Sequence, residues 1–191
     1  LFFAMLFSSG IAVAAGSHGV RNGSFGSRVA RPADLAAKQE RVAQLRKQGW
    51  TCPDAGDWPL SWDGQGDGMT VEWPATGGVD NDRHARLSGG VGGYVNGYWG
   101  QFLTGSHVLT FRARGKGTLR VGLMAWKYAD DRATPLPGNA DVPGLALRVD
   151  SPEWVRYRYL MRKPAWEVVG HPLFQAPEGT VDFDDVGITD S

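Results

Sequence analysis

The 191-residue sequence has little of several features that would each define a class of protein. It has a single cysteine, Cys52, so it cannot form an internal disulfide, and no Cys or His partner stands at metal-ligand spacing. Its 20 basic and 20 acidic residues balance, whereas a nucleic-acid-binding domain usually has a basic surplus. No run of about 20 apolar residues occurs. We therefore expect neither a nucleic-acid partner nor a membrane span.

Motifs for common catalytic sites are also lacking. The sequence contains no G-x-S-x-G element and no Walker loop, and the glycine-rich stretch "GGVGGYVNG" has no lysine and no helical pattern after it. Acidic residues such as Asp130, Asp131 and Glu153 stand outside any recognisable catalytic context. We therefore expect that the chain is not an enzyme.

What the sequence does contain is typical of an all-β protein. Its 27 glycines and 11 prolines separate short apolar runs, and 42% of its residues are hydrophobic, enough for a substantial core. The first fifteen residues, "LFFAMLFSSGIAVAA", resemble the apolar part of a secretory signal and end in an A-x-A cleavage site. We expect residues 1–15 to be a signal peptide, truncated at its start, and residues 16–191 to be the exported domain.

Four stretches alternate as strands do: 107–115, 117–128, 153–162 and 179–188. We expect the first two to form a hairpin through Gly115-Lys116-Gly117. Leu109, Phe111 and Ala113 fall on one face of their strand, and arginines fall on the other. One helix is predicted at 33–48, capped by Asp34, and a short strand at 20–26. This pattern predicts an all-β fold, a two-sheet antiparallel β-sandwich with one inserted N-terminal helix.

Five segments occur in a familiar order: "NGSF" (22–25), "HARLSGG" (84–90), "LTGSHVLTFRARGKG" (103–117), "EWVRYRYLM" (153–161) and "FDDVGI" (183–188). In this order the chain resembles secreted carbohydrate-binding modules of the family 4/9 type, which are jelly rolls of the galactose-binding-like superfamily. The resemblance implies an exported jelly roll that binds a polysaccharide or oligosaccharide.

The resemblance also implies a role for two adjacent acids in the closing strand, Asp184 and Asp185. In such modules an acidic residue in this strand often helps to bind a structural calcium ion beside the first strand. The implied ligands are Asp184 or Asp185 with backbone oxygens near Asn22 and Ser24. Family members often have an acid after "NGSF", where this chain has Gly26. The alternative is that both acids are solvated or accept N–H groups.

A site that binds sugars combines flat aromatic rings, on which the sugar stacks, with polar hydrogen-bond donors. We expect exposed platforms at Trp126 and Tyr128, which leave their strand opposite its aliphatic residues, and at three rings in the glycine-rich stretch: Tyr94, Tyr98 and Trp99. Further candidate platforms stand in the Pro/Gly/Asp-rich stretch 52–74: Trp58, Trp62 and Trp73.

Arginines lie on the outer faces of the predicted strands. If those strands share a sheet, the arginines form a cationic surface beside Trp126 that favours acidic polysaccharide: Arg112, Arg114, Arg120, Arg156 and Arg158. Arg120 and Arg158 are the members expected to bind ligand. The alternative is a solvated face balanced by nearby acids.

Together these features predict a non-catalytic polysaccharide-binding module, monomeric, accessory to glycoside hydrolysis, and secreted, periplasmic or on the cell surface. A structural or protein-interaction sandwich without a sugar site stays open as an alternative. So does a small lyase or hydrolase on the same scaffold, because a fold does not fix a function.

Overall fold

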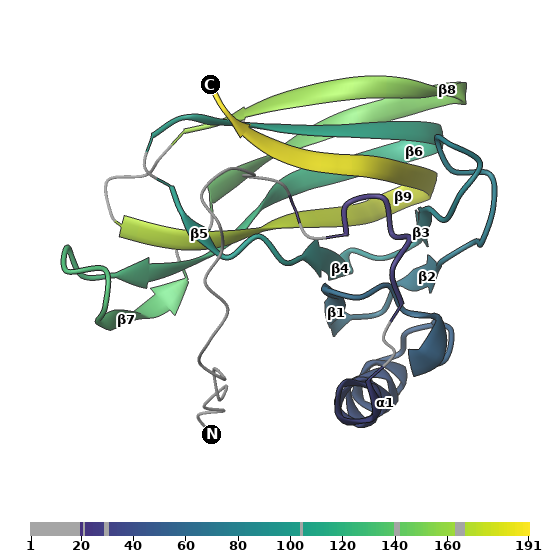
Figure 1. Ribbon diagram of the computed structural model, residues 1–191. Coiled ribbons are helices and arrows are strands. Elements are labelled where there is room, and N and C mark those ends of the chain that lie inside the picture. The colour runs from purple at the N-terminus through teal and green to yellow at the C-terminus, as the bar shows by residue number, and fades with distance from the viewer. Residues whose placement is uncertain (1–19, 21, 29–30, 104, 140–141, 163–166) are drawn as a thin grey trace.

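The computed structural model describes residues 20, 22–28, 31–103, 105–139, 142–162 and 167–191 (Figure 1). The predicted signal peptide at 1–15 lies outside them. One α-helix precedes nine strands: α1 Pro32–Lys47, β1 Trp62–Asp67, β2 Thr70–Glu72, β3 Ala85–Ser88, β4 Gly92–Gly97, β5 Gln101–Phe102, β6 His107–Tyr128, β7 Pro135–Asn139, β8 Val142–Met161 and β9 Glu167–Asp190. A short 3-10 turn, η1, spans Ala55–Asp57.

The three long strands, β6, β8 and β9, fold back across the molecule. Phe174 and Phe183 lie nine positions apart in β9, which is about 30 Å in a straight strand. Their rings nevertheless stack with centroids 4.2 Å apart. Figure 1 shows both ends of β9 on the same side of the molecule and its middle at the opposite side. Each long strand therefore contributes one half to each of two facing layers.

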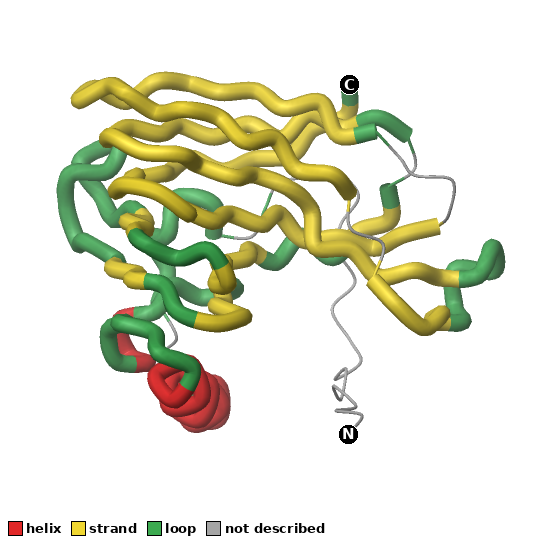
Figure 2. Tube along the Cα trace, turned by 180° about the vertical axis from the view of Figure 1, so that it is seen from behind, coloured by secondary structure: helices red, strands yellow, loops and turns green. Residues whose placement is uncertain are grey.

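The β-ladders define these layers. The upper layer joins residues 155–161 of β8, 107–113 of β6 and 181–190 of β9 to β3 and β2. The lower layer joins 142–149 of β8, 117–128 of β6 and 167–176 of β9 to β4 and β1, with β5 and β7 at its far end. All these pairings are antiparallel. The predicted two-sheet antiparallel β-sandwich with one helix is confirmed (Figure 2).

The predicted hairpin at Gly115–Gly117 is wrong. Residues 107–128 form one strand, which pairs with β8 on one side and β9 on the other straight through these glycines. The two halves of β6 thus face each other across the core and do not pair edge to edge. Glycine is needed at the bend because the neighbouring backbone is close: a Cβ on Gly115 would lie 2.5 Å from the Thr180 carbonyl oxygen.

Gly179 marks the same bend in β9 and yields the first prediction. Its φ is +75°, and a Cβ there would lie 2.1 Å from the Lys116 carbonyl oxygen. We expect Gly179→Ala to lower the free energy of unfolding by about 1–2 kcal/mol through the left-handed conformation, with further loss from the overlap. Gly26→Ala is the control, because nothing lies within 4 Å of its Cβ position. Equal urea midpoints for both variants would show that the bend tolerates a side chain.

Aromatic side chains fill the core between the layers. Trp58, Trp62 and Trp73 are all buried, with Trp62 packed on Phe25 at 4.7 Å. These three tryptophans were expected as exposed platforms, and that expectation is wrong. The stretch 52–74 has the composition of a loop, yet it folds as η1, β1 and β2 over the aromatic core, which takes up the indole rings.

The helix α1 packs beside β1 and away from the long strands (Figure 2). Val42 and Leu45 are its buried residues, and Lys38 donates to the Trp62 carbonyl oxygen at 2.8 Å. Asp34 is not the cap: Arg31 precedes the first turn, and Asp34 pairs with it at 2.6 Å. No helix in the described part of the chain is long and apolar enough to span a membrane.

The segment before the helix differs from the predicted short strand. The described residues 22–24 form a turn, in which Asn22 has a φ of +53°. This turn lies beside the closing strand, as expected, because the Val186 N–H donates to the Gly23 carbonyl oxygen at 3.1 Å.

Candidate functional site

The outward surface of the lower layer, here called the lower face, collects polar and aromatic side chains from four strands. Arg120 of β6 pairs with Gln175 of β9 in the ladder. Val95 of β4 pairs with Phe174 of β9. Because these strands are antiparallel, Tyr94, the residue before Val95, lies beside Gln175, the residue after Phe174. Because side chains alternate between faces, these three residues point outward while Phe174 points into the core.

A groove of about 440 Å³ lies on this face. Its floor and walls come from β4, β6, β8 and β9: Tyr94, Arg120, Val121, Gly122, Leu123, Met124, Gly144, Ala146, Leu173 and Gln175. Gly122 and Gly144 contribute no side chains there, which keeps the centre of the groove open. Arg120 is exposed and is the one charged residue among the described residues of its lining.

Tyr94 is held in place at one wall of the groove. Its hydroxyl donates to Gln65 Oε1 at 3.1 Å and lies 3.3 Å from Met124 Sδ. Gln65 in turn donates to Asn96 Oδ1 at 3.4 Å. The ring is half-buried, so its orientation is fixed while part of its surface stays open to a ligand.

His171 joins two further rings next to the groove. Its imidazole lies 4.9 Å from the ring centroid of Tyr98 and 4.9 Å from that of Trp126. Nδ1 accepts the Trp99 N–H at 3.2 Å, which fixes the imidazole. Burial lowers the pKa of His171 to about 4, opposed by a hydrogen bond with the Gly97 carbonyl, so the ring is neutral at pH 7. His171 thereby orients Tyr98 and Trp126.

Tyr128 lies beyond Trp126 at the far end of the same face. Its ring packs edge-on against Phe102 at 5.2 Å. The guanidinium group of Arg132 lies over the same Phe102 ring, 5.3 Å from its centroid, and donates to Glu167 Oε2 at 2.8 Å. The turn after β6 thus closes this end of the lower face.

Four of the seven residues predicted to bind ligand therefore lie near one another on the lower face: Tyr94, Tyr98, Trp126 and Arg120. Tyr128 lies at the end of the same face. Trp99 does not belong to this set. It is 3% exposed and packs edge-on against buried His107 at 5.3 Å, so its expected role as an exposed platform is wrong.

Arg158 is also separated from the groove. It pairs with Thr110 in the upper layer, whereas Arg120 pairs with Ala146 in the lower one. Arg112 and Arg156 share the upper layer with Arg158, and Arg114 stands at its border, opposite Asp182 of β9. The predicted cationic surface beside Trp126 is therefore wrong, because the bends in β6 and β8 place these arginines on the opposite side of the sandwich. The basis for a preference for acidic polysaccharide is lost with it.

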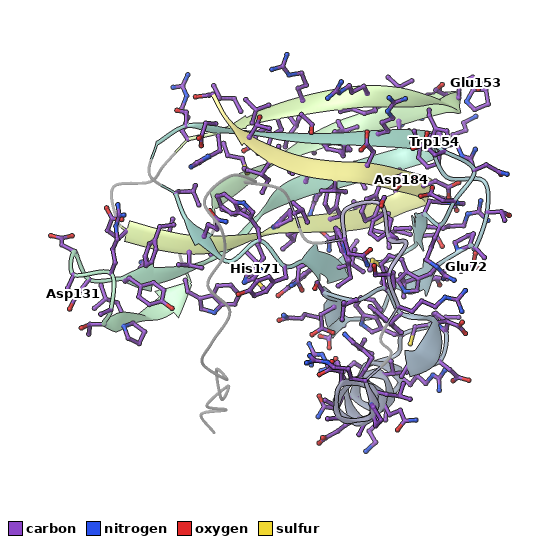
Figure 3. All side chains as sticks on the ribbon, viewed as in Figure 1. Glu72, Asp131, Glu153, Trp154, His171 and Asp184 are labelled. Atoms are coloured by element: carbon purple, nitrogen blue, oxygen red, sulfur yellow. The ribbon has the colours of Figure 1, made fainter. Side chains whose placement is uncertain are left out.

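The outward surface of the upper layer, here called the upper face, contains a buried ionic network around Asp182. Arg86 approaches Asp182 Oδ1 at 2.7 Å and Oδ2 at 3.1 Å, and Arg114 donates to Oδ2 at 3.0 Å. His84 Nε2 lies 3.3 Å from the same Oδ2. Burial alone would raise the pKa of Asp182, but these three partners hold it well below its usual range. Trp154 covers the network, with Arg114 over its ring at 4.5 Å (Figure 3).

The adjacent acids Asp184 and Asp185 form a β-bulge. From Thr110 to Arg112, β6 advances two residues while β9 advances three, from Asp184 to Gly187. Asp185 has a φ of +52°, a conformation that Asp tolerates better than most residues, and it pairs with Arg112 at 3.4 Å. Asp184 is 1% exposed and accepts the N–H groups of Val79 at 2.8 Å and of Asp185 at 2.7 Å.

The expected calcium site combines the carboxylate of Asp184 or Asp185 with backbone oxygens near Asn22 and Ser24, in the turn that lies beside the closing strand. The Asn22 side chain bonds to Ser27 and to the Leu60 carbonyl, Ser24 is exposed, and Asp185 faces Arg112. The carboxylate that approaches Asp184 is Asp82, whose Oδ1 is buried without a hydrogen bond in the described structure. No group of three or more potential metal-ligating side chains occurs among the described residues. Calcium at Asp184 stays a prediction.

Sequence reasoning missed the part of this site that lies in the first half of β9. Leu173 and Gln175 alternate there with the buried residues Phe174 and Ala176, which is a strand signal, and buried His171 precedes them. Pro172 concealed it, because proline is rarely found inside a sheet. Pro172 is tolerated since the β4 ladder ends at Leu173 and the β5 ladder begins at Gly170, which leaves a gap opposite it.

Comparison with known proteins gives similarity in fold alone. No protein-family profile and no curated protein matches the chain. The CBM22-1–GH10 modules of a Clostridium thermocellum endo-1,4-β-D-xylanase, complexed with xylohexaose, are 16% identical with a TM-score of 0.47; the match covers 69% of this chain and 26% of that one.

Two smaller structures match over most of their own length. A CBM22-2 xylan-binding domain from Paenibacillus barcinonensis is 17% identical with a TM-score of 0.45 and is matched over 92% of its length by 69% of this chain. A CBM4 structure is 15% identical with a TM-score of 0.44 and is matched over 98% of its length by 71% of this chain. Membership of the family 4/9 type stays a prediction.

Proposed function

We propose that this protein binds a polysaccharide or oligosaccharide along its lower face and does not transform it chemically. The observation that carries the proposal is an open groove lined by Tyr94, Arg120 and Gln175. Two more half-buried rings, Tyr98 and Trp126, pack on His171, whose ladder partner Met124 also lines the groove. Each ring is held by neighbours, so the surface is preorganised for a ligand.

This arrangement suits the chemistry of a sugar. A pyranose ring presents a patch of C–H groups that stacks on an aromatic ring, and its hydroxyls need donors and acceptors at the rim. Arg120 has no ion pair among the described residues and supplies donors, and the amide of Gln175 supplies both donors and acceptors. One arginine does not make a strongly cationic groove, so we expect neutral glycans to bind at least as well as acidic ones.

Binding fits the groove better than catalysis does. Glycoside hydrolysis needs two carboxylates on either side of the scissile bond, and the described residues that line the groove include none. We propose that the module is exported, acts as a monomer, and holds a glycan for a hydrolase located on another domain or protein.

Trp126→Ala tests the proposal directly. Because stacking on an indole contributes about 1–2 kcal/mol, we expect the variant to bind a soluble neutral polysaccharide about tenfold more weakly. Affinity electrophoresis against xylan, mixed-linkage β-glucan and polygalacturonate would identify the ligand, and isothermal titration would measure the change.

Matched controls come from the upper face. Trp154→Ala removes another half-buried indole, and Arg158→Ala removes an exposed arginine that serves as the control for Arg120→Ala. Both control variants should bind as the wild type does. Loss of binding in Trp154→Ala with retention in Trp126→Ala would place the sugar on the other layer. Absence of binding to every glycan tested would favour the structural or protein-interaction alternative.

A further inference from the structure

The outer edge of β8 is the longest strand edge left unpaired in the described part of the structure. Among the described strands β8 pairs with β6 alone over its 20 residues, so no described strand pairs with its other side. Such an edge is a template for an additional strand. Pro143 and Pro152 interrupt the first part of the edge, since proline has no N–H to donate. Residues 154–161, here called the docking edge, contain no proline.

The docking edge also exposes two apolar side chains. Leu160 is 45% exposed and Val155 is 39% exposed. Leu160 shares the outer face with Arg156 and Arg158, since their partners on β6 are Val108, Arg112 and Thr110. Val155 lies on the opposite, core-facing side. An added strand with alternating side chains would therefore meet Arg156 and Arg158, here called the basic row, on one face and the apolar Val155 on the other.

The basic row lacks counter-charges. Residues 154–162 contain three arginines and no acid. Arg156 stands directly opposite Arg112 on β6, an arrangement that destabilises a strand pair. Asp185 pairs with Arg112 and Asp182 with Arg114, and no ion pair reaches Arg156 or Arg158 among the described residues. A carboxylate placed beside Arg156 and Arg158 would relieve this repulsion.

We propose that the docking edge binds an extended acidic segment of another protein, which adds to the upper layer as a further strand beside β8. Its acidic side chains meet Arg156 and Arg158 on the outer face, and the alternating apolar side chains cover Val155 on the other. Main-chain hydrogen bonds supply affinity, and the alternating charges supply specificity.

A second copy of this chain fits the same edge poorly. Consider two copies whose docking edges pair antiparallel around Tyr157, the middle of the edge, with their outer faces on the same side of the joined sheet. Arg156 of each copy then stands opposite Arg158 of the other. Like charges directly opposite one another destabilise such a pair. The basic row thus rejects self-association and selects an acidic strand.

A fluorescein-labelled peptide of alternating Glu and Val, titrated into the full chain and followed by anisotropy, tests this proposal. We expect saturable binding that added salt weakens and that Arg156→Glu/Arg158→Glu weakens at least about tenfold. A Lys-Val peptide should not bind. Binding should also slow amide hydrogen exchange across residues 154–161. The thermal midpoint of the double variant should be no lower than that of the wild type, because Arg156→Glu removes the repulsion with Arg112, and this would show that the variant is folded.

A peptide N-methylated at alternate residues separates strand addition from simple charge attraction. It retains every carboxylate but cannot make the ladder on its methylated side, so we expect at least about a tenfold loss of affinity. Equal binding of the methylated and unmethylated peptides would overturn the proposal. A second result would also overturn it: the wild type binds polygalacturonate, the Arg156→Glu/Arg158→Glu variant does not, and no peptide binds to either. The basic row would then bind an acidic glycan.

Discussion

Asp182→Asn should lower the free energy of unfolding by about 3–5 kcal/mol, the largest loss we expect from a single charged residue here. The carboxylate accepts from both Arg86 and Arg114 and lies 3.3 Å from His84 while buried beneath Trp154. Asparagine keeps the shape but removes the negative charge and turns an NH₂ group toward one of these donors. Two guanidinium groups are then left next to each other without a counter-charge.

Urea unfolding at pH 7 measures this loss, and Asp185→Asn is the matched control. Asp185 lies three residues further along β9, is exposed, and has a positive φ that asparagine also adopts readily. We expect the control to change the unfolding free energy by no more than about 0.5 kcal/mol. A loss in Asp182→Asn no larger than that of the control would mean that the network contributes no net stability.

The pH dependence has a definite sign. The pKa of Asp182 is held below its usual range, so its contribution is present above the pKa of the unfolded carboxyl, about 3.9. It is lost as the pH falls below that value. Between about pH 5 and pH 8 the ionisation of Asp182 should therefore leave the difference between the wild type and Asp182→Asn unchanged, and below about pH 5 the difference should shrink.

The strand faces could be predicted from the sequence, but the bends could not. Alternation correctly placed Leu109, Phe111 and Ala113 in the core. Gly-Lys-Gly has the same local requirements in a hairpin and in a strand that bends from one layer to the other. What decides between them is pairing with β8 and β9, whose residues stand more than 25 positions away in the chain. The error mattered, because it placed Arg120 and Arg158 on one surface.

The candidate site was predicted in part for a similar reason. Tyr94, Tyr98 and Trp126 share a face because β4 and β6 both border β9. Alternation along its strand predicted the outward position of Trp126, and the neighbouring glycines predicted those of Tyr94 and Tyr98. Trp99 looks equivalent in sequence, but the chain turns after β4 and takes its ring inward. Burial of an aromatic ring depends on which layer lies over it, and one strand's pattern does not show that.

Asp184→Asn should have the opposite effect to Asp182→Asn, although both carboxylates lie on β9 two residues apart. Burial raises the pKa of Asp184 to about 6, and nearby Asp82 adds to this, against the N–H groups of Val79 and Asp185, which lower it. The folded protein therefore favours the protonated form. Its stability contribution is complete below the unfolded pKa of about 3.9 and is lost as the pH rises through about 6.

Because asparagine does not ionise, the variant should lack this pH dependence. The wild type should gain stability relative to Asp184→Asn as the pH falls from 8 to 4, by roughly 3 kcal/mol for a pKa difference of about two units. Urea unfolding at both pH values in the presence of EDTA measures the change. Asp185→Asn again serves as the control, and its difference from the wild type should not follow the same course.

The same variant tests the predicted calcium ion. A cation beside Asp184 and Asp82 would stabilise the charged carboxylates, so adding calcium at pH 8 should stabilise the wild type and not Asp184→Asn. No response of the wild type to calcium, together with the pH-dependent difference in EDTA, would mean that a proton alone neutralises Asp184. A flat pH profile of the difference in EDTA would contradict the burial argument itself, because Asp184 would then ionise as easily in the folded protein as in the unfolded chain.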